Sequence, residues 1–393
     1  SYSVEEETTG SIGGNIGYSD FGLMLGFNLQ EQNFLGSGNT VGIGINKNIY
    51  SEMYNISYMN PYATRDGVSL GYNLYFRETD YGEFNVANYL TNSNGFGAQF
   101  GYPISDITRL GFNITYDKTD IDVGSLPARE IYDFVSAEGN IFETLSAQLS
   151  WQRVTLNRGL FPTDGASTVL SFSSTIPGSD LSYYRLNVRQ RYYQPLTQNL
   201  VFGFQGELGY LNAYGDTEET PFFQNFYAGG PRSLRGFESN TLGPRSTDAP
   251  CYEFNYAEGT CPNLLDIDGD GELDTPYYNP YANQTSRYRD APIGGNIKIE
   301  GSLQLIFKLP FIEDQRSLRS AFFFDFGNVF SDNCKEYQIN CSEPSIDDLR
   351  YSYGVGITWI TGFGPMSLAI AKPTNAGPRE RTEEFQFTVG NVF

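Results

Sequence analysis

Four aspartates follow one another at intervals that suit a calcium ion. Asp266, Asp268, Asp270 and Asp274 stand at positions 1, 3, 5 and 9 of an acidic segment with glycine at position 6. EF-hand loops place oxygen ligands at these positions. Position 12 is Tyr277, where such loops carry a bidentate glutamate. The segment therefore matches only the beginning of a calcium loop, and two interpretations stay open: an acidic, solvated segment, or a calcium site at these four aspartates.

The four cysteines form two close pairs, Cys251/Cys261 and Cys334/Cys341, each within a polar segment. The chain has no Cys-x-x-Cys motif and no histidine, so the usual mixed cysteine–histidine metal sites are disfavoured. Two local disulfides, formed in an oxidising compartment, are the simplest interpretation of this spacing.

Enzymatic and nucleic-acid functions find little support in the composition. Without histidine, a Ser/His/Asp set cannot exist and the most frequent general base is missing. The net charge of −21 opposes binding to nucleic acid, which requires a basic surface. We therefore predict a protein that is not an enzyme, requires no cofactor and does not bind nucleic acid.

The elements that position these residues are short segments in which apolar and polar residues alternate. Tyrosine and phenylalanine are abundant, and aromatic residues make up 16% of the chain. No run of about 18 apolar residues occurs, so no transmembrane helix is predicted. The predicted strands are Gly10–Tyr18, Leu23–Phe34, Thr40–Asn48, Met53–Met59, Val68–Thr79, Gly95–Tyr102, Arg109–Thr119, Leu145–Leu156, Ala166–Ile176, Tyr183–Gln194, Leu200–Tyr210, Asn296–Leu309, Ser320–Phe330, Tyr351–Ile360, Met366–Lys372 and Glu384–Phe393.

Each predicted strand has one apolar and one polar face. In Asn296–Leu309, for example, Ile299 and Leu303 share a face opposite Lys298 and Glu300. A soluble β-sandwich also buries an apolar face, but repetition through about sixteen strands without companion helices favours an outer-membrane barrel. The predicted fold is all-β, a sixteen-stranded antiparallel transmembrane β-barrel. A short surface helix is predicted at Pro127–Val135.

One connection, about residues 214–295, is far longer than the others. It contains the Leu234-Arg235-Gly236-Phe237 stretch, the Cys251/Cys261 pair and the acidic segment. Short and long connections alternate along the chain, and in outer-membrane barrels the longer ones face the outside. A charged side chain inside a barrel needs a partner, because desolvation of the charge is costly. We expect this long extracellular loop to fold back into the lumen, where the charge of Arg235 would need a partner.

The residues around Arg235 are similar to a known loop motif. Leu234-Arg235-Gly236-Phe237 resembles the Val-Arg-Gly-Phe motif of the BamA family of outer-membrane assembly proteins, with leucine at the first position. Agreement extends over essentially the whole chain. Further stretches that agree are Phe226–Gly230, Glu238–Pro244, Asn60–Tyr62, Asp66–Gly71, Phe161–Gly165, Ile176–Asp180, Phe322–Gly327 and Glu384–Phe387. Residues 1–9 look like the tail of the family's last periplasmic POTRA domain, which leaves residues 10–393 for the barrel.

The resemblance implies an insertase that folds and inserts β-barrel proteins into the bacterial outer membrane without covalent chemistry. It implies unfolded outer-membrane proteins as substrates, lipoproteins that dock mainly on periplasmic domains as partners, and an integral location in the outer membrane. The alternatives are a related secretion or translocation pore, a passive porin, and an outer-membrane enzyme. A lumen occupied by the long loop argues against the porin.

The same resemblance implies an anchor for the long loop. Three phenylalanines of Ser320–Phe330 share the lipid face, so Asp325 points inward, and Arg235 is expected to pair with it. The family carries a second acid at the position of Gln304, and Glu300 is one candidate for a third partner. A solvated Arg235 in a flexible loop is the alternative.

Glycines mark a weak seam between the first and last strands, as the resemblance implies. Glycine weakens strands, and an open strand edge can pair with another chain. We therefore expect substrate strands to pair at the seam, whereas the alternative is that glycine only relieves crowding. The predicted seam residues are Gly10, Gly13, Gly14, Gly17, Gly390 and Phe393.

Overall fold

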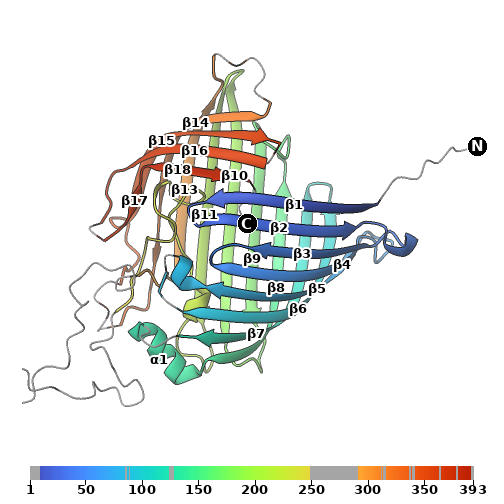
Figure 1. The fold of residues 1–393 in the computed structure, drawn as a ribbon, viewed down its shortest axis with the longest axis vertical. Helices are drawn as coiled ribbons and strands as arrows, with labels where there is room; N and C mark the ends of the chain where they lie inside the picture. Colours follow the sequence, from blue (N-terminus) through green and yellow to red (C-terminus); the bar gives the residue numbers. More distant parts are fainter. Residues whose placement is uncertain are drawn as a thin grey trace, which may run out of the picture.

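The structure, a computed structural model, describes residues 9–84, 86–87, 89–123, 128–247, 291–310, 312, 316–335, 338, 341–362, 364–377 and 379–390. These residues form an all-β barrel with one short α-helix, α1 (Arg129–Glu138) (Figure 1). No helix among them is long and apolar enough to cross a membrane.

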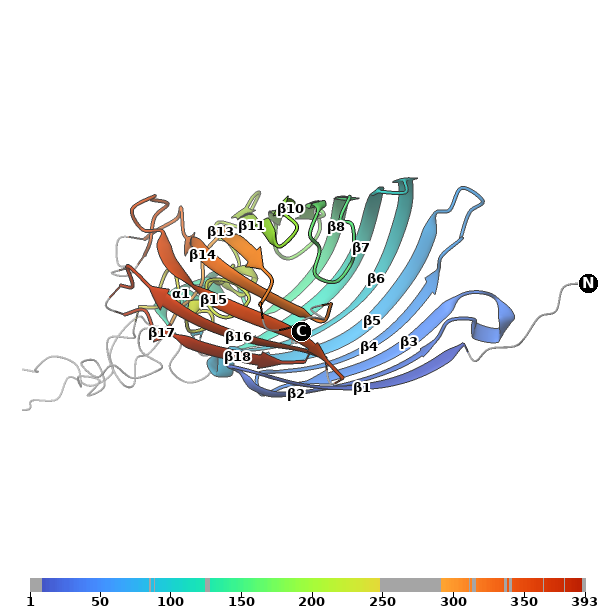
Figure 2. The same ribbon diagram turned by 90° about the horizontal axis from the view of Figure 1, so that it is seen from above.

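Sixteen strands close the barrel wall, which confirms the predicted fold. Every pairing between neighbours is antiparallel, and β1 closes the ring against β18. Figure 2 shows the strands curving around a common interior. The wall strands are β1 (Gly10–Ser19), β2 (Gly22–Glu31), β3 (Thr40–Lys47), β4 (Ser51–Asn60), β5 (Ser69–Asp80), β6 (Leu90–Ser105), β7 (Thr108–Asp122), β8 (Ile141–Val154), β9 (Gly165–Thr175), β10 (Tyr183–Thr197), β11 (Leu200–Ala213), β13 (Ile297–Phe307), β14 (Leu318–Phe330), β15 (Arg350–Thr361), β16 (Gly364–Pro373) and β18 (Phe385–Val389).

Two further strands are not part of the barrel wall. β12 (Gly236–Phe237) and β17 (Thr382–Glu383) pair with each other in a small antiparallel sheet. The 3-10 helices are Phe34–Gly36, Tyr81–Phe84 and Phe222–Gln224. β12 belongs to the long connection between β11 and β13, and β17 belongs to the last connection before β18.

The largest deviations from the predicted strands occur where local pattern competes with tertiary pairing. β6 begins at Leu90 rather than Gly95, because polar Thr91 and Ser93 face the interior and continue the ladder with β7. β18 ends at Val389, since Gly390 has a positive φ of 78° and leaves the extended conformation. The predicted helix is present but shifted to Arg129–Glu138.

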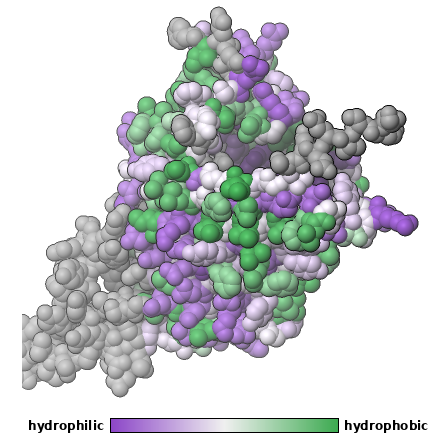
Figure 3. All heavy atoms as spheres, turned by 45° about the vertical axis from the view of Figure 1, so that its right-hand side comes forward, coloured by the Kyte–Doolittle hydropathy of each residue, from purple (hydrophilic) through white to green (hydrophobic). Residues whose placement is uncertain are grey.

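The alternation of faces is visible along β2, where Leu23, Leu25, Phe27 and Leu29 are exposed while Met24 is buried. Exposed apolar side chains recur around the wall, as a lipid-facing surface requires. Figure 3 shows apolar residues gathered over the middle of the visible wall, among pale and hydrophilic ones.

The long connections share one rim and pack together there. They follow β5, β7, β11, β14 and β16, which are alternate turns of the chain around the barrel. Ile131 and Phe134 of α1 form a buried apolar cluster with Phe222 of the longest connection. The Glu130 carboxylate accepts hydrogen bonds from the Thr247 backbone, at 3.0 and 3.1 Å. Connections distant in sequence therefore brace one another at this rim.

Candidate functional site at the loop anchor and the seam

Arg235 is anchored to the inner face of the barrel wall. Its Nε and Nη2 atoms donate to the two carboxylate oxygens of Asp325, each at 2.7 Å. The guanidinium also lies 3.4 Å from the centre of the Phe323 ring. Asp325 is fully buried, whereas Phe322 and Phe324 on the opposite face of β14 are exposed. The predicted ion pair is confirmed, in the bidentate geometry that makes arginine–carboxylate pairs strong.

The third partner of this anchor is a serine rather than a glutamate. Arg235 Nη2 donates to Ser302 Oγ at 3.0 Å, and Ser302 stands directly opposite Asp325 on β13. Glu300, the candidate from sequence, instead accepts a hydrogen bond from Ser233 and pairs with Lys298 at 3.0 Å. Ser302, and not Glu300, contacts Arg235 because the register of β13 and β14 places Ser302 opposite Asp325.

The position expected to hold a second acid is occupied by a neutral side chain, Gln304. The Gln304 side chain donates to Ser302 Oγ at 3.2 Å and accepts from Arg319 at 3.3 Å. It supports the anchor through Ser302, without adding charge.

The loop tip also binds the last strand, a contact that the sequence analysis missed. Gly236 and Phe237 pair with Glu383 and Thr382 in the β12–β17 sheet. The buried Gln386 side chain of β18 donates to the Phe237 carbonyl at 2.8 Å and accepts from the Gly236 N–H at 3.3 Å. Its only signal in the sequence was an amide on the inward face of the last strand. The tip therefore joins β14 to β18 on the inside of the barrel.

The remaining motif residues fit the tip into the wall. Leu234 and Phe237 are buried in an apolar cluster with Leu211 and Val329. Gly236 has a φ of 92°, and a Cβ there would lie 3.2 Å from the Ala371 side chain. A residue with a side chain would be strained at this position, so the motif requires its glycine.

The seam between β1 and β18 is narrow. Among the described residues, the pairing is registered at Tyr18 and Val389, whereas β1 pairs with β2 from Gly10 to Ser19. Gly10, Gly13 and Gly14 thus lie in the part of β1 that pairs with β2 but, among the described residues, has no registered pair in β18. Among the described residues, the pairing of β1 is therefore much shorter on the β18 side than on the β2 side.

The backbones of the two seam strands approach closely at one point. A Cβ on Gly390 would lie 2.4 Å from the Ile16 carbonyl oxygen and 2.9 Å from the Gly17 Cα atom. Gly390 is therefore required for steric reasons as well as for its positive φ. Phe393, the remaining predicted seam residue, lies outside the described residues.

The loop tip also approaches the first strands. Burial lowers the pKa of the Arg232 guanidinium, while the nearby Tyr50 and Asp20 raise it. Asp20 belongs to the turn between β1 and β2, and Tyr50 to the turn between β3 and β4. A cavity of about 390 Å³ below the tip is lined by Arg232, Gln386 and Gly390, among others. The tip thus has neighbours on both sides of the seam and space beneath it.

The disulfide predicted at Cys334 and Cys341 is present, with an S–S distance of 1.97 Å. Cys251 and Cys261, and the acidic segment with Asp266, Asp268, Asp270 and Asp274, lie outside the described residues. In the part of the chain that is described, no group of three or more His, Cys, Asp or Glu residues could hold a metal ion.

Calcium binding by the acidic segment remains a prediction. Titration of calcium into the protein is expected to release or absorb heat at a single saturable site, since Asp266, Asp268, Asp270 and Asp274 supply carboxylate oxygens at the required spacing. Asp268→Ala should abolish that signal in calorimetry. An unchanged titration for this variant would instead mean a solvated acidic segment.

Residues 33–393 match the Omp85 superfamily domain, and the chain belongs to that family. The outer-membrane protein assembly factor BamA of Neisseria meningitidis is 28% identical over 420 residues, which cover 100% of this chain and 48% of that protein. Human sorting and assembly machinery component 50 homolog is 23% identical, over 89% of this chain and 64% of its own length.

The fold is also similar to that of a solved BamA structure. The crystal structure of BamA from Haemophilus ducreyi lacking POTRA domains 1–3 superposes with a TM-score of 0.81 at 27% identity, over 99% of this chain and 71% of that one. The barrel is therefore of the BamA type, and the chain is an integral outer-membrane protein. It spans about half the length of the Neisseria relative.

Proposed function

We propose that the protein containing this chain folds and inserts β-barrel proteins into the outer membrane by strand pairing at the seam. The observation that carries this proposal is the short described pairing of β1 with β18, registered at Tyr18 and Val389, beside the full ladder of β1 with β2 from Gly10 to Ser19. Unpaired backbone N–H and C=O groups on a strand edge form hydrogen bonds readily with an added strand. Two relatives support this role: one is an outer-membrane protein assembly factor, and the other is a homolog of a sorting and assembly machinery component.

In this proposal the barrel supplies a template and no covalent chemistry. A substrate strand that pairs antiparallel with β1 has the same direction as β18. It would occupy the position beside β1 that β18 occupies in the closed barrel. The substrates would be unfolded outer-membrane proteins, and the bilayer would receive the product. Lipoprotein partners would dock mainly on periplasmic domains of the assembly machinery.

Reconstitution of the full-length parent protein in liposomes is the direct test. We expect a model barrel protein, added unfolded, to reach its protease-resistant folded form several-fold faster than in empty liposomes. Liposomes that contain an unrelated outer-membrane barrel are the control for nonspecific defects. Equal rates in all three preparations would reject the insertase, and a steady ionic conductance of the pure barrel would then favour a secretion pore or porin.

A further inference from the structure

We propose that Arg350 and Glu380 are positioning residues of the seam, and this inference rests on the proposed function. The two residues hold the last long connection, residues 374–384. This connection keeps β17 paired with the loop tip and fixes the position at which β18 begins. Neither residue belongs to the loop motif or to the seam itself. They act through the connection that leads into β18.

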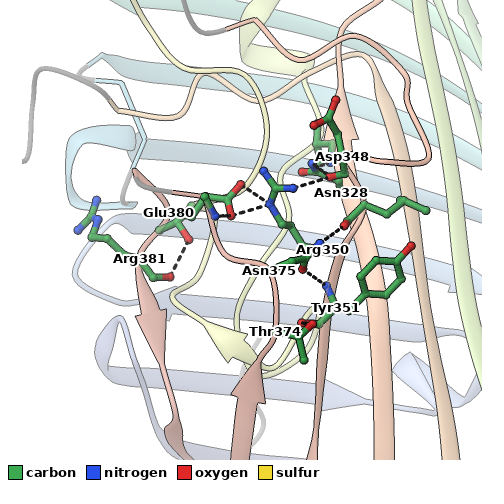
Figure 4. Close-up of polar contacts among 12 residues, drawn as sticks. Asn328, Asp348, Arg350, Tyr351, Thr374, Asn375, Glu380 and Arg381 are labelled. Carbon is green, nitrogen blue, oxygen red and sulfur yellow. Dashed lines mark hydrogen bonds and ion pairs between the residues drawn. The ribbon is translucent and has the colours of Figure 1, made fainter.

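Glu380 is bound by the first residue of β15. Arg350 Nε lies 2.7 Å from both Glu380 carboxylate oxygens, and the Gly377 N–H donates to Oε2 at 2.7 Å. The two side chains are only 17% and 9% exposed. Figure 4 shows Arg350 and Glu380 pointing toward each other between the connection and the wall. The pair is thus shielded from water, where loss of one partner is most costly.

The same guanidinium is fixed to the wall. Arg350 Nη1 donates to the Asp348 carbonyl at 3.2 Å, and that carbonyl also accepts from the buried Asn328 side chain of β14 at 2.7 Å. Asn375 continues this attachment, since it accepts from the Tyr351 N–H at 2.9 Å and donates to the Leu349 carbonyl at 2.7 Å (Figure 4). The beginning and middle of the connection are therefore attached to β14 and β15.

The end of the connection, from Arg381 to Glu383, contacts the loop tip. Arg381 directly follows Glu380, and its carbonyl accepts from the Glu238 N–H at 3.0 Å. Its guanidinium also pairs with the Glu238 carboxylate at 3.2 Å. Thr382 and Glu383 then pair with β12, and Phe385 begins β18. A displacement at Glu380 is therefore transmitted to the start of the seam strand within five residues.

Removal of the Arg350 charge should release the connection. Glu380 would remain buried with the Gly377 N–H as its remaining described donor, and an uncompensated buried carboxylate moves toward water when the chain allows it. A connection of eleven residues allows such a movement while the wall strands remain paired. We expect β17 to leave the loop tip more often and β18 to lose its fixed starting point.

The test follows the contact between β17 and β12 in the full-length protein. Glu238→Cys and Arg381→Cys place a reporter at two neighbouring backbones whose own ion pair is about one third exposed, and such exposed pairs add little stability. In that background, Arg350→Gln should slow formation of the reporter disulfide about tenfold, which requires the loss of at least about 1.4 kcal/mol of docking free energy. Arg350→Lys should restore part of the rate, since it keeps the charge but cannot bond Glu380 and the Asp348 carbonyl with two fixed guanidinium nitrogens.

Lys118→Gln is the matched control, because it removes a cation from an exposed ion pair with Glu143. It should leave the reporter rate unchanged. Glu380→Gln should reproduce the effect of Arg350→Gln. Heat-dependent gel migration reports separately whether each barrel is folded.

The outcomes separate this inference from the proposed function. A slowed reporter in a folded barrel supports positioning, even if the unsubstituted protein assembles nothing in liposomes, and in that case only the proposed function fails. If the unsubstituted protein is active, assembly should fall with the reporter rate in Arg350→Gln and recover with Arg350→Lys. An unchanged reporter rate overturns the inference. So does loss of the folded barrel in both Arg350→Gln and Glu380→Gln, since the pair would then support the barrel as a whole.

Discussion

Alanine in place of Arg235 is expected to destabilise the barrel by about 3–5 kcal/mol, the range for a buried ion pair that loses one partner. Asp325 is fully buried, and without the guanidinium its carboxylate keeps only the Arg235 backbone N–H, at 3.2 Å, among the contacts described. Heat-dependent gel migration of the folded barrel should show the loss as a lower transition temperature. The assembly rate in liposomes should fall with it, because the tip would no longer join β14 to β18.

The double variant Arg235→Ala/Asp325→Asn distinguishes the free energy of the ion pair from the cost of leaving a buried charge without a partner. An asparagine leaves no buried charge, so the double variant should be more stable than Arg235→Ala alone. Ser302→Ala, which removes an acceptor of the charged Arg235 guanidinium, should cost about 1.5–3 kcal/mol. If Arg235→Ala retained full stability and full assembly, the arginine would be a solvated group of no structural weight.

A disulfide across the seam should stop assembly. Tyr18 and Val389 are direct partners in antiparallel strands, so cysteines at these positions stand within the separation that a disulfide can bridge. With the bond closed, the edge of β1 could not separate from β18, and we expect the assembly rate to fall at least about tenfold. A reductant should restore it.

Each single cysteine variant, treated with the same oxidant and reductant, controls for effects on the native disulfide at Cys334 and Cys341. A second pair at Leu25 and Lys47, partners in β2 and β3, controls for a cross-link elsewhere in the wall. Undiminished assembly with the seam verifiably closed would rule out strand pairing there.

The wall could be predicted from the sequence because each strand carries its own evidence. Alternation in Asn296–Leu309 identifies both the strand β13 and the direction in which Lys298 and Ile299 point. The inward position of Asp325 follows from its phenylalanine neighbours in the same way. These conclusions need only the two-residue period of a strand.

Contacts between strands depend on register, which the period does not supply. Ser302 rather than Glu300 meets Arg235, although both face the lumen, because Ser302 is opposite Asp325. The pairing of β12 with β17 joins residues almost 150 positions apart, and two-residue strands leave no pattern of their own. The Arg350–Glu380 pair was likewise invisible, since each residue resembles an ordinary charged group near a strand end.

The β12–β17 sheet has a consequence for how this barrel itself acquires its shape. β17 pairs with Gly236 and Phe237, which directly follow Arg235 and its ion pair with Asp325 of β14, so we expect β17 to form on a loop tip that is already anchored to β14. We therefore expect the middle of the chain to enter the interior before β17 and the final strand reach their places. Contacts so distant in sequence are slow to form, because a long chain segment must first be ordered. Ring closure would then be the last and slowest event in its maturation, and a chain stalled just before it would expose both terminal strands at once.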